Sequence, residues 1–173
     1  MREAHIASLS GTTDATTTVF RYIDWLVTVP LQIVEFYLIL AAVTIVPLML
    51  FWRLLGASLV MLIFGFMGEA GLGDPMIMFV IGMIGWIYII YEVFAGEASR
   101  LSVSSANKGA QFAFNNLRLI LTVGWAIYPI GYYIGMESGG SDTANIVYNI
   151  ADLVNKAAFG LVIWAGAKMD SEE

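Results

Sequence analysis

The sequence predicts an all-α membrane protein with five transmembrane helices, and its composition and apolar stretches are the evidence. Of its 173 residues, 59% are hydrophobic and 13% are charged, whereas charged residues make up about a quarter of an ordinary soluble domain. Mean hydropathy is +0.78. Apolar stretches of about 20 residues, the length that crosses the hydrocarbon core of a bilayer, recur along the chain. Most of the chain is therefore expected to have lipid as its solvent.

The predicted spans follow one another with short polar connections. Because lipid offers no hydrogen bonds to the backbone, helices are the expected form of segments this long. We expect the polar, threonine-rich residues 1–17 to form an extracellular loop or tail, residues 18–168 to form the transmembrane domain, and residues 169–173 to form a cytoplasmic tail. The five spans are predicted at about 18–41, 48–70, 75–96, 109–135 and 143–168.

Basic residues favour one orientation in the cell membrane. Cytoplasmic connections of membrane proteins carry an excess of Lys and Arg. The N-terminal side has only Arg2, whereas the C-terminal side has Arg53, Arg100, Lys108 and Lys168. We therefore expect the N-terminus outside and the C-terminus in the cytoplasm.

Composition also excludes several classes of function. The chain has no cysteine and one histidine, which argues against disulfides, thiol chemistry and a Cys/His metal centre. Its formal charge of −6 argues against nucleic acid as a partner, because that partner requires clustered basic residues.

Five ionisable residues lie within the first and last predicted spans, ahead of their C-terminal ends. They are Arg21, Asp24, Glu35, Asp152 and Lys156. Each Arg, Lys or Asp at the centre of a membrane helix costs about 2.5–3.5 kcal/mol, so such residues usually have a functional role. Asp152 and Lys156 share a helix face at the i, i+4 spacing. In the predicted topology Arg21, Asp24 and Asp152 meet in the outer half of the membrane, where two cations and two anions can neutralise one another. The alternative is that Asp152 and Lys156 form a purely structural pair.

Glu35 lies on the same predicted helix face as Asp24, close to three turns and ~16 Å further along the axis. A desolvated carboxyl with no cation nearby tends to be protonated, whereas one beside a cation tends to be ionised. We therefore predict a protonated Glu35 on one side of Lys156 and an ionised Asp24 on the other. Glu35 as a neutral hydrogen-bonded core residue is the alternative.

Three stretches of the sequence resemble the proteorhodopsins, a group of the microbial rhodopsins. They are RYIDWLVTVPLQIVEFYLILAA, GWAIYPIGYYIG and NIVYNIADLVNKAAFGLVIW. The resemblance implies that Lys156 binds all-trans retinal as a protonated Schiff base. It also implies roles for five further residues: Asp24 as proton acceptor and counter-ion, Asp152 as second counter-ion, Arg21 in the counter-ion complex, Thr28 as the middle residue of an Asp-Thr-Glu triplet, and Glu35 as proton donor.

The same resemblance implies an aromatic pocket for retinal, an apolar polyene that needs a slot with little water. Gln32 matches the position that tunes colour in this family, where Gln goes with blue absorption. Taken singly, each Trp or Tyr is more often a packing or interfacial residue, and a lipid-facing or helix-contact Gln32 is the alternative. The implied pocket residues are Trp25, Trp86, Trp125, Tyr128 and Pro129.

The resulting functional hypothesis is a light-driven outward proton pump, an ion transporter rather than an enzyme. A photosensor that signals to a transducer and a retinal-free proton-coupled transporter are the alternatives. Because the family has seven helices, we expect a partial sequence that lacks the first two, and the family also implies homo-oligomers. Glu69 and Glu92 lie near predicted helix ends and are interpreted as interfacial.

Overall fold

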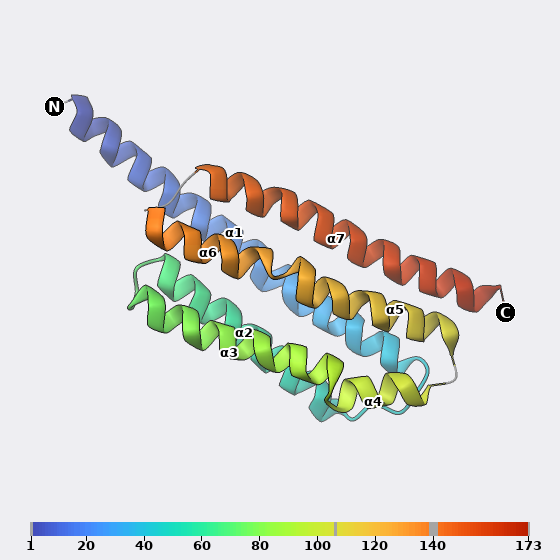
Figure 1. The fold of residues 1–173 in the computed structure, drawn as a ribbon. Helices are drawn as coiled ribbons and strands as arrows, with labels where there is room; N and C mark the ends of the chain where they lie inside the picture. The colour runs from blue at the N-terminus through green and yellow to red at the C-terminus, as the bar shows by residue number, and fades with distance from the viewer. Residues whose placement is uncertain (1, 106, 139–141, 173) are drawn as a thin grey trace.

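The computed structural model describes the backbone of residues 2–105, 107–138 and 142–172, and the side chains of residues 17–105, 107–136 and 145–172. In this described part every regular element is a helix, and the helices form a bundle (Figure 1). The elements in chain order are α1 Arg2–Ala41, α2 Leu48–Glu69, α3 Pro75–Phe94, α4 Glu97–Ser104, α5 Lys108–Leu119, the π-helix η1 Ile120–Gly124, α6 Ile127–Ser138 and α7 Asp142–Ser171.

Among the described residues, five helical segments are long and apolar enough to cross a membrane, which confirms the predicted fold class. Where the prediction gave one span at 109–135, the structure has α5, η1 and α6 end to end as one rod. The five segments are Thr17–Ala41, Leu48–Glu69, Pro75–Ser104, Lys108–Met136 and Asn145–Ser171.

The ends of the chain differ from the prediction. Residues 2–16, expected as a loop or tail, continue α1 back to Arg2, and this part of α1 extends beyond the other helices (Figure 1). The segment contains no proline and a single glycine. A helix already nucleated in the span propagates through such a segment at little cost, because only nucleation is strongly unfavourable. At the other end, α7 continues to Ser171 rather than stopping at 168.

Local capping explains where the inner helices begin. Pro47 stands in an extended conformation before α2. Asp74 caps α3, because its side chain accepts a hydrogen bond of 2.9 Å from the Ile77 N–H, and Pro75 occupies the first turn, where no backbone donor is needed. Asn107 caps α5 in the same way through the Ala110 N–H.

The helix pair α2 and α3 packs especially closely, and glycine makes this possible. A Cβ atom at Gly85 would lie 2.6 Å from the Ala57 carbonyl oxygen of α2. Small residues at such contacts let helix backbones approach one another in membrane proteins. The close pair forms one wall of the bundle, and α5, α6 and α7 form the opposite wall (Figure 1).

The apolar core and the main cavity occupy different ends of the bundle. Fully buried side chains gather toward the α4 end, and examples are Phe36 of α1, Leu54 of α2, Ile89 of α3 and Phe114 of α5. Toward the other end, α1, α2, α3, α6 and α7 leave space between them. The bundle is therefore solid at one end and hollow toward the other.

Candidate functional site

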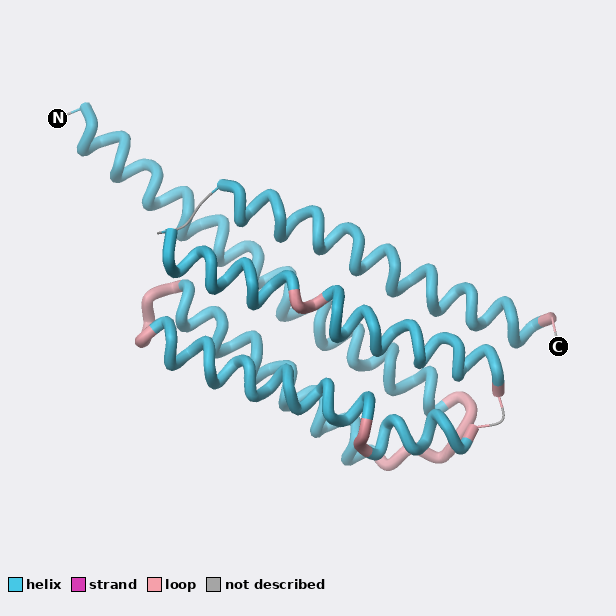
Figure 2. Tube along the Cα trace, in the orientation of Figure 1, coloured by secondary structure: helices cyan, strands magenta, loops and turns pink. Residues whose placement is uncertain are grey.

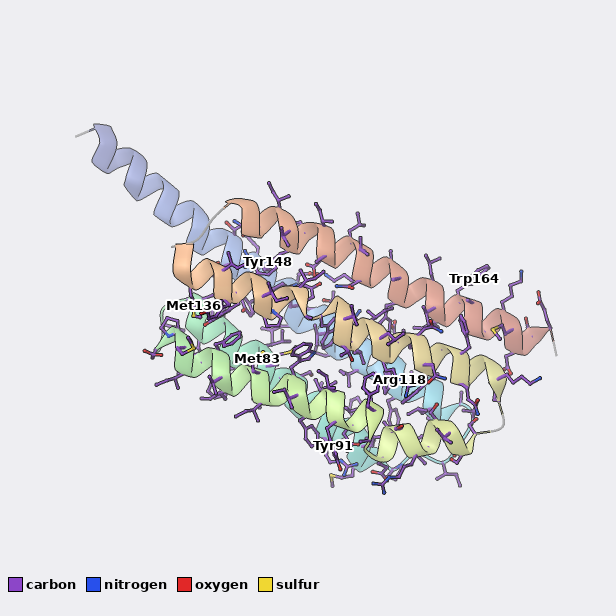
Figure 3. All side chains as sticks on the ribbon, in the orientation of Figure 1. Met83, Tyr91, Arg118, Met136, Tyr148 and Trp164 are labelled. Carbon is purple, nitrogen blue, oxygen red and sulfur yellow. The ribbon has the colours of Figure 1, made fainter. Side chains whose placement is uncertain are left out.

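The hollow part of the bundle is a cavity of about 810 Å³, a volume that includes space open to the exterior. The lining is mainly aromatic and apolar, and Met83 on α3 points into the space between helices (Figure 3). Among the residues predicted for the site, the lining includes Trp25, Thr28, Gln32, Trp86, Trp125, Tyr128, Pro129, Asp152 and Lys156.

Lys156 lies between the two carboxylates that the sequence placed near it. Its ammonium group forms an ion pair and hydrogen bond with Asp24 of α1, and its Nζ lies 3.6 Å from Asp152 Oδ2 on the preceding turn of α7. The side chains of Lys156 and Asp24 retain 33% and 45% of their exposure. The ion pair therefore lies at an open side of the cavity, where no described helix covers it.

Asp152 is held more firmly than Asp24. The Trp25 Nε1–H donates to both of its oxygens at 3.1 and 3.0 Å, and the Tyr128 hydroxyl donates to Oδ1 at 2.6 Å. The rings of Trp25 and Tyr128 also meet edge to face, with centroids 5.0 Å apart. Asp152 is thereby fixed against the aromatic wall, whereas Lys156 is the only side-chain partner of Asp24 among the described residues.

Two further predicted residues extend the lining along α1. The Thr28 hydroxyl donates to the Asp24 carbonyl at 3.0 Å, so it lies one turn further along the same helix. Gln32 is 8% exposed and lines the cavity. The lipid-facing interpretation of Gln32 is therefore wrong.

Arg21 forms a different partnership from the one predicted. Its Nη1 lies 2.8 Å from Glu69 Oε2, its Nη2 hydrogen-bonds Asn145, and its guanidinium carbon lies 4.5 Å from the centre of the Tyr148 ring. Within the described part of the chain, the expected cluster of Arg21 with Asp24 and Asp152 is therefore corrected to a separate ion pair. Glu69 competes successfully because it comes from the end of α2 that faces Arg21.

The two glutamates interpreted as interfacial lie inside the bundle. Glu69 lines the cavity and accepts a hydrogen bond of 3.0 Å from Tyr22. Glu92, with 3% of its side chain exposed, pairs with Arg53 at 3.2 Å and accepts the Glu97 N–H at 2.9 Å. A buried carboxylate needs such partners. Glu92 thus joins α2 to the start of α4.

Glu35 lies apart from the cavity. It shares the exposed face of α1 with Asp24, as the spacing predicted, but it does not contribute to the lining. Within the described residues it has no ion-pair partner. The sequence therefore identified correctly the face of α1 on which Glu35 lies.

This constellation is suited to holding a covalently bound group and moving protons. A lysine amine can condense with an aldehyde, and carboxylates beside it can take up or supply protons when they are within hydrogen-bond reach. The aromatic lining suits an elongated apolar ligand. This chemistry needs no metal centre with cysteine or histidine ligands.

Comparison with known proteins identifies the family. Residues 2–169 match the family described as bacteriorhodopsin-like protein. The chain belongs to this family. As a bacteriorhodopsin-like protein it is 54% identical, over 163 residues, to the blue-light absorbing proteorhodopsin of gamma-proteobacterium Hot 75m4. The matched region covers 92% of this chain and 64% of that relative, so the chain spans less than two thirds of the relative's length.

Solved structures of bacteriorhodopsin-like proteins have the same arrangement of helices. The blue light-absorbing proteorhodopsin from Med12 superposes with a TM-score of 0.75 at 59% identity, over 88% of this chain and 68% of that one. Xanthorhodopsin, described as a light-driven ion pump with dual chromophore, superposes with a TM-score of 0.72 at 27% identity, over 89% of this chain and 64% of that one. The predicted resemblance to proteorhodopsins is confirmed.

Several residues of this bacteriorhodopsin-like site were missed from sequence. Phe79, Gly82 and Met83 line the cavity on α3, and helical spacing from Trp86 would have indicated them, because residues three, four and seven apart share a face. Asn155 was missed although it lies three residues after Asp152, a spacing that places the two on one face of α7. It is next to Lys156 in the chain, yet its contacts depend on the shape of the α5–α6 rod.

Proposed function

We propose that the protein containing this chain is a light-driven outward proton pump that carries all-trans retinal on Lys156. The observation that supports this most is the position of the Lys156 ammonium, at the edge of an aromatic cavity and between the carboxylates of Asp24 and Asp152. A structural i, i+4 pair would account for Asp152, but it would not require a second carboxylate from α1 or an aromatic cavity beside it.

The residues present fit retinal. The cavity is lined by residues from five helices, α1, α2, α3, α6 and α7, and Trp25, Trp86 and Trp125 contribute flat apolar surfaces to its lining. When bound through Lys156 Nζ, retinal would supply the absorption of visible light and a light-driven change of shape. Gln32 would bring a polar amide to the lining, where it would influence the absorbed colour.

Protons would move through the carboxylates of α1. Asp152 already accepts hydrogen bonds from Trp25 and Tyr128, so both of its oxygens have donors other than Lys156. Asp24 is the carboxylate that is free to take the proton from the nitrogen of Lys156. Glu35, about three turns away on the same face, would return a proton from the opposite side. Net movement then runs from Glu35 toward Asp24.

The direction of transport depends on orientation. The N-terminus outside and the C-terminus in the cytoplasm of the plasma membrane would make this movement outward, and the basic residues support that orientation. Under this proposal, residues 1–17 are extracellular and residues 169–173 cytoplasmic. Homo-oligomers belong to the same proposal and are supported by the family alone.

Illumination of cells tests the pump directly. Cells that express the protein at its natural length are supplied with all-trans retinal in unbuffered medium. We expect light to acidify the medium, and a protonophore to abolish the change. A visible retinal band without any pH change would favour a photosensor, and the absence of a band would favour a transporter without retinal.

Replacement of the proposed donor gives a kinetic test. Glu35→Gln is expected to slow the return of the proton to the Lys156 nitrogen by about 100-fold or more, in line with the contribution of a positioned acid. Flash spectroscopy of the retinal band measures this rate. Glu97→Gln is the matched control, because Glu97 pairs with Arg53 at the α4 end. Equal rates in the Glu35→Gln variant and the unmodified protein would remove Glu35 from the donor role.

A further inference from the structure

The rod formed by α5 and α6 is interrupted beside the cavity. Residues Ile120–Gly124 form the π-helix η1, and a short non-helical segment at Trp125 and Ala126 follows it (Figure 2). The Trp125 N–H bonds to the Ile120 carbonyl at 3.0 Å, five residues back. Such wide turns are rare, and they often occur at functional sites or kinks.

Side chains from two other helices bind the carbonyl groups of this interruption. The Trp86 Nε1–H of α3 donates to the Leu121 carbonyl at 2.9 Å. Asn155 Nδ2 of α7 donates to the Gly124 carbonyl at 3.0 Å. Backbone carbonyls freed by an irregular turn need donors of this kind when they are buried. The interruption is therefore tied on one side to α3 and on the other to α7.

Asn155 also reaches the charged site. It is almost fully buried, and its Nδ2 lies 3.3 Å from the Tyr128 hydroxyl, which in turn donates to Asp152. Asp152 lies beside Lys156. One amide group thus contacts both the backbone of the interruption and the hydroxyl that holds a carboxylate near Lys156.

Gly124 leaves space for the Asn155 amide because it has no side chain. A Cβ atom at Gly124 would lie 2.2 Å from Asn155 Oδ1, which is far inside van der Waals contact. Any larger residue at this position would force the amide away from the backbone. The absence of a side chain at Gly124 and the presence of the amide at Asn155 are thus parts of one contact.

We propose that Asn155 is a positioning residue that couples the charged site at Lys156 to the interruption in the α5–α6 rod. Its amide holds the Tyr128 hydroxyl against Asp152 and holds Gly124 at the irregular turn. A change of charge at Lys156 or Asp152 reaches the rod through Tyr128 and Asn155. This inference rests on the proposed function for its consequence in pumping, but its contacts can be tested without retinal.

The first test measures backbone hydrogen exchange in the retinal-free protein at its natural length in lipid nanodiscs. Asn155→Leu keeps a side chain of similar size and removes both donated hydrogen bonds. We expect amide hydrogens of residues 120–128 to exchange roughly fivefold faster, the factor for loss of one typical hydrogen bond. The control is Asn116→Leu, because Asn116 is half-buried and its side chain donates to the Phe112 carbonyl in its own helix. Equal exchange in the two variants would overturn the inference.

The second test measures the absorption maximum after retinal is added, because a merely structural contact remote from the charges would leave it unchanged. Gly124→Ala and Asn155→Ala are each expected to shift the maximum. The double variant is expected to match Asn155→Ala alone, because the added methyl then meets no amide. Additive shifts, or no shift in either single variant, would overturn the coupling. Absence of a retinal band in the unmodified protein would instead count against the proposed function, and the exchange measurement would still decide the contact.

Discussion

Lys156→Ala is expected to abolish the visible retinal band completely. The Nζ atom of Lys156 is the amine that lies beside the aromatic cavity, and without it no covalent attachment forms there. The measurement is the absorption spectrum of purified protein after addition of all-trans retinal. Retinal that merely partitions into the detergent would absorb in the near ultraviolet, so a band in the visible range reports the attachment.

The control for this prediction lies on the same helix. Lys168 is exposed near the end of α7 and pairs with Glu172 at 3.6 Å, so Lys168→Ala changes the total charge equally but leaves the cavity intact. We expect Lys168→Ala to retain the full band. A visible band of unchanged position and height in Lys156→Ala would contradict the attachment at Lys156.

Loss of Lys156 should also alter stability, because two carboxylates would lose their shared cation. Removal of one partner from a buried ion pair costs several kcal/mol, whereas exposed pairs contribute little. Asp24 and Lys156 are partly exposed in the described structure. The free energy of unfolding is therefore expected to fall by less than it would for a fully buried pair. The spectrum of Lys156→Ala should therefore be interpreted together with a circular dichroism measurement of helix content.

The five spans were predictable because they depend on local composition. Each needs only a continuous apolar stretch of sufficient length, and starts such as Asp74-Pro75 carry a capping signal in the sequence itself. The π-helix was not predictable in this way. Its turn depends on donors from Trp86 and Asn155, which lie on other helices and far along the chain.

The contacts of the site also divide into those that the sequence predicts and those that depend on distant parts of the fold. The pairing of Lys156 with Asp152 follows from helical spacing, and that with Asp24 follows from the predicted topology, in which the first and fifth spans run in the same direction through the membrane. The pairing of Arg21 with Glu69 joins residues 48 positions apart. The predicted cluster had instead joined Arg21 to Asp24 and Asp152. Only the orientation of the α2 end decides between them, so this contact required the structure.

Asp24→Asn is expected to stop proton transport while the retinal band is retained. The amide of Asn is close in shape to the carboxylate, but it cannot take up a proton at neutral pH. A positioned base commonly contributes a factor of about 100 or more to proton transfer, so light-driven acidification should fall to the level of cells without the protein. The measurement pairs the initial rate of acidification with the absorbance of the visible band.

Comparison with two other aspartates isolates the role of Asp24. Asp74→Asn should leave transport unchanged, because Asn caps the start of α3 as well as Asp does. Asp152→Asn should disturb the retinal band itself, because the amide retains only one acceptor oxygen for the donors Trp25 and Tyr128. Acidification at the normal rate in Asp24→Asn would exclude Asp24 as acceptor. If transport then failed only in Asp152→Asn, the firmly held carboxylate would have to take the proton, and its hydrogen bonds would have to break during each cycle.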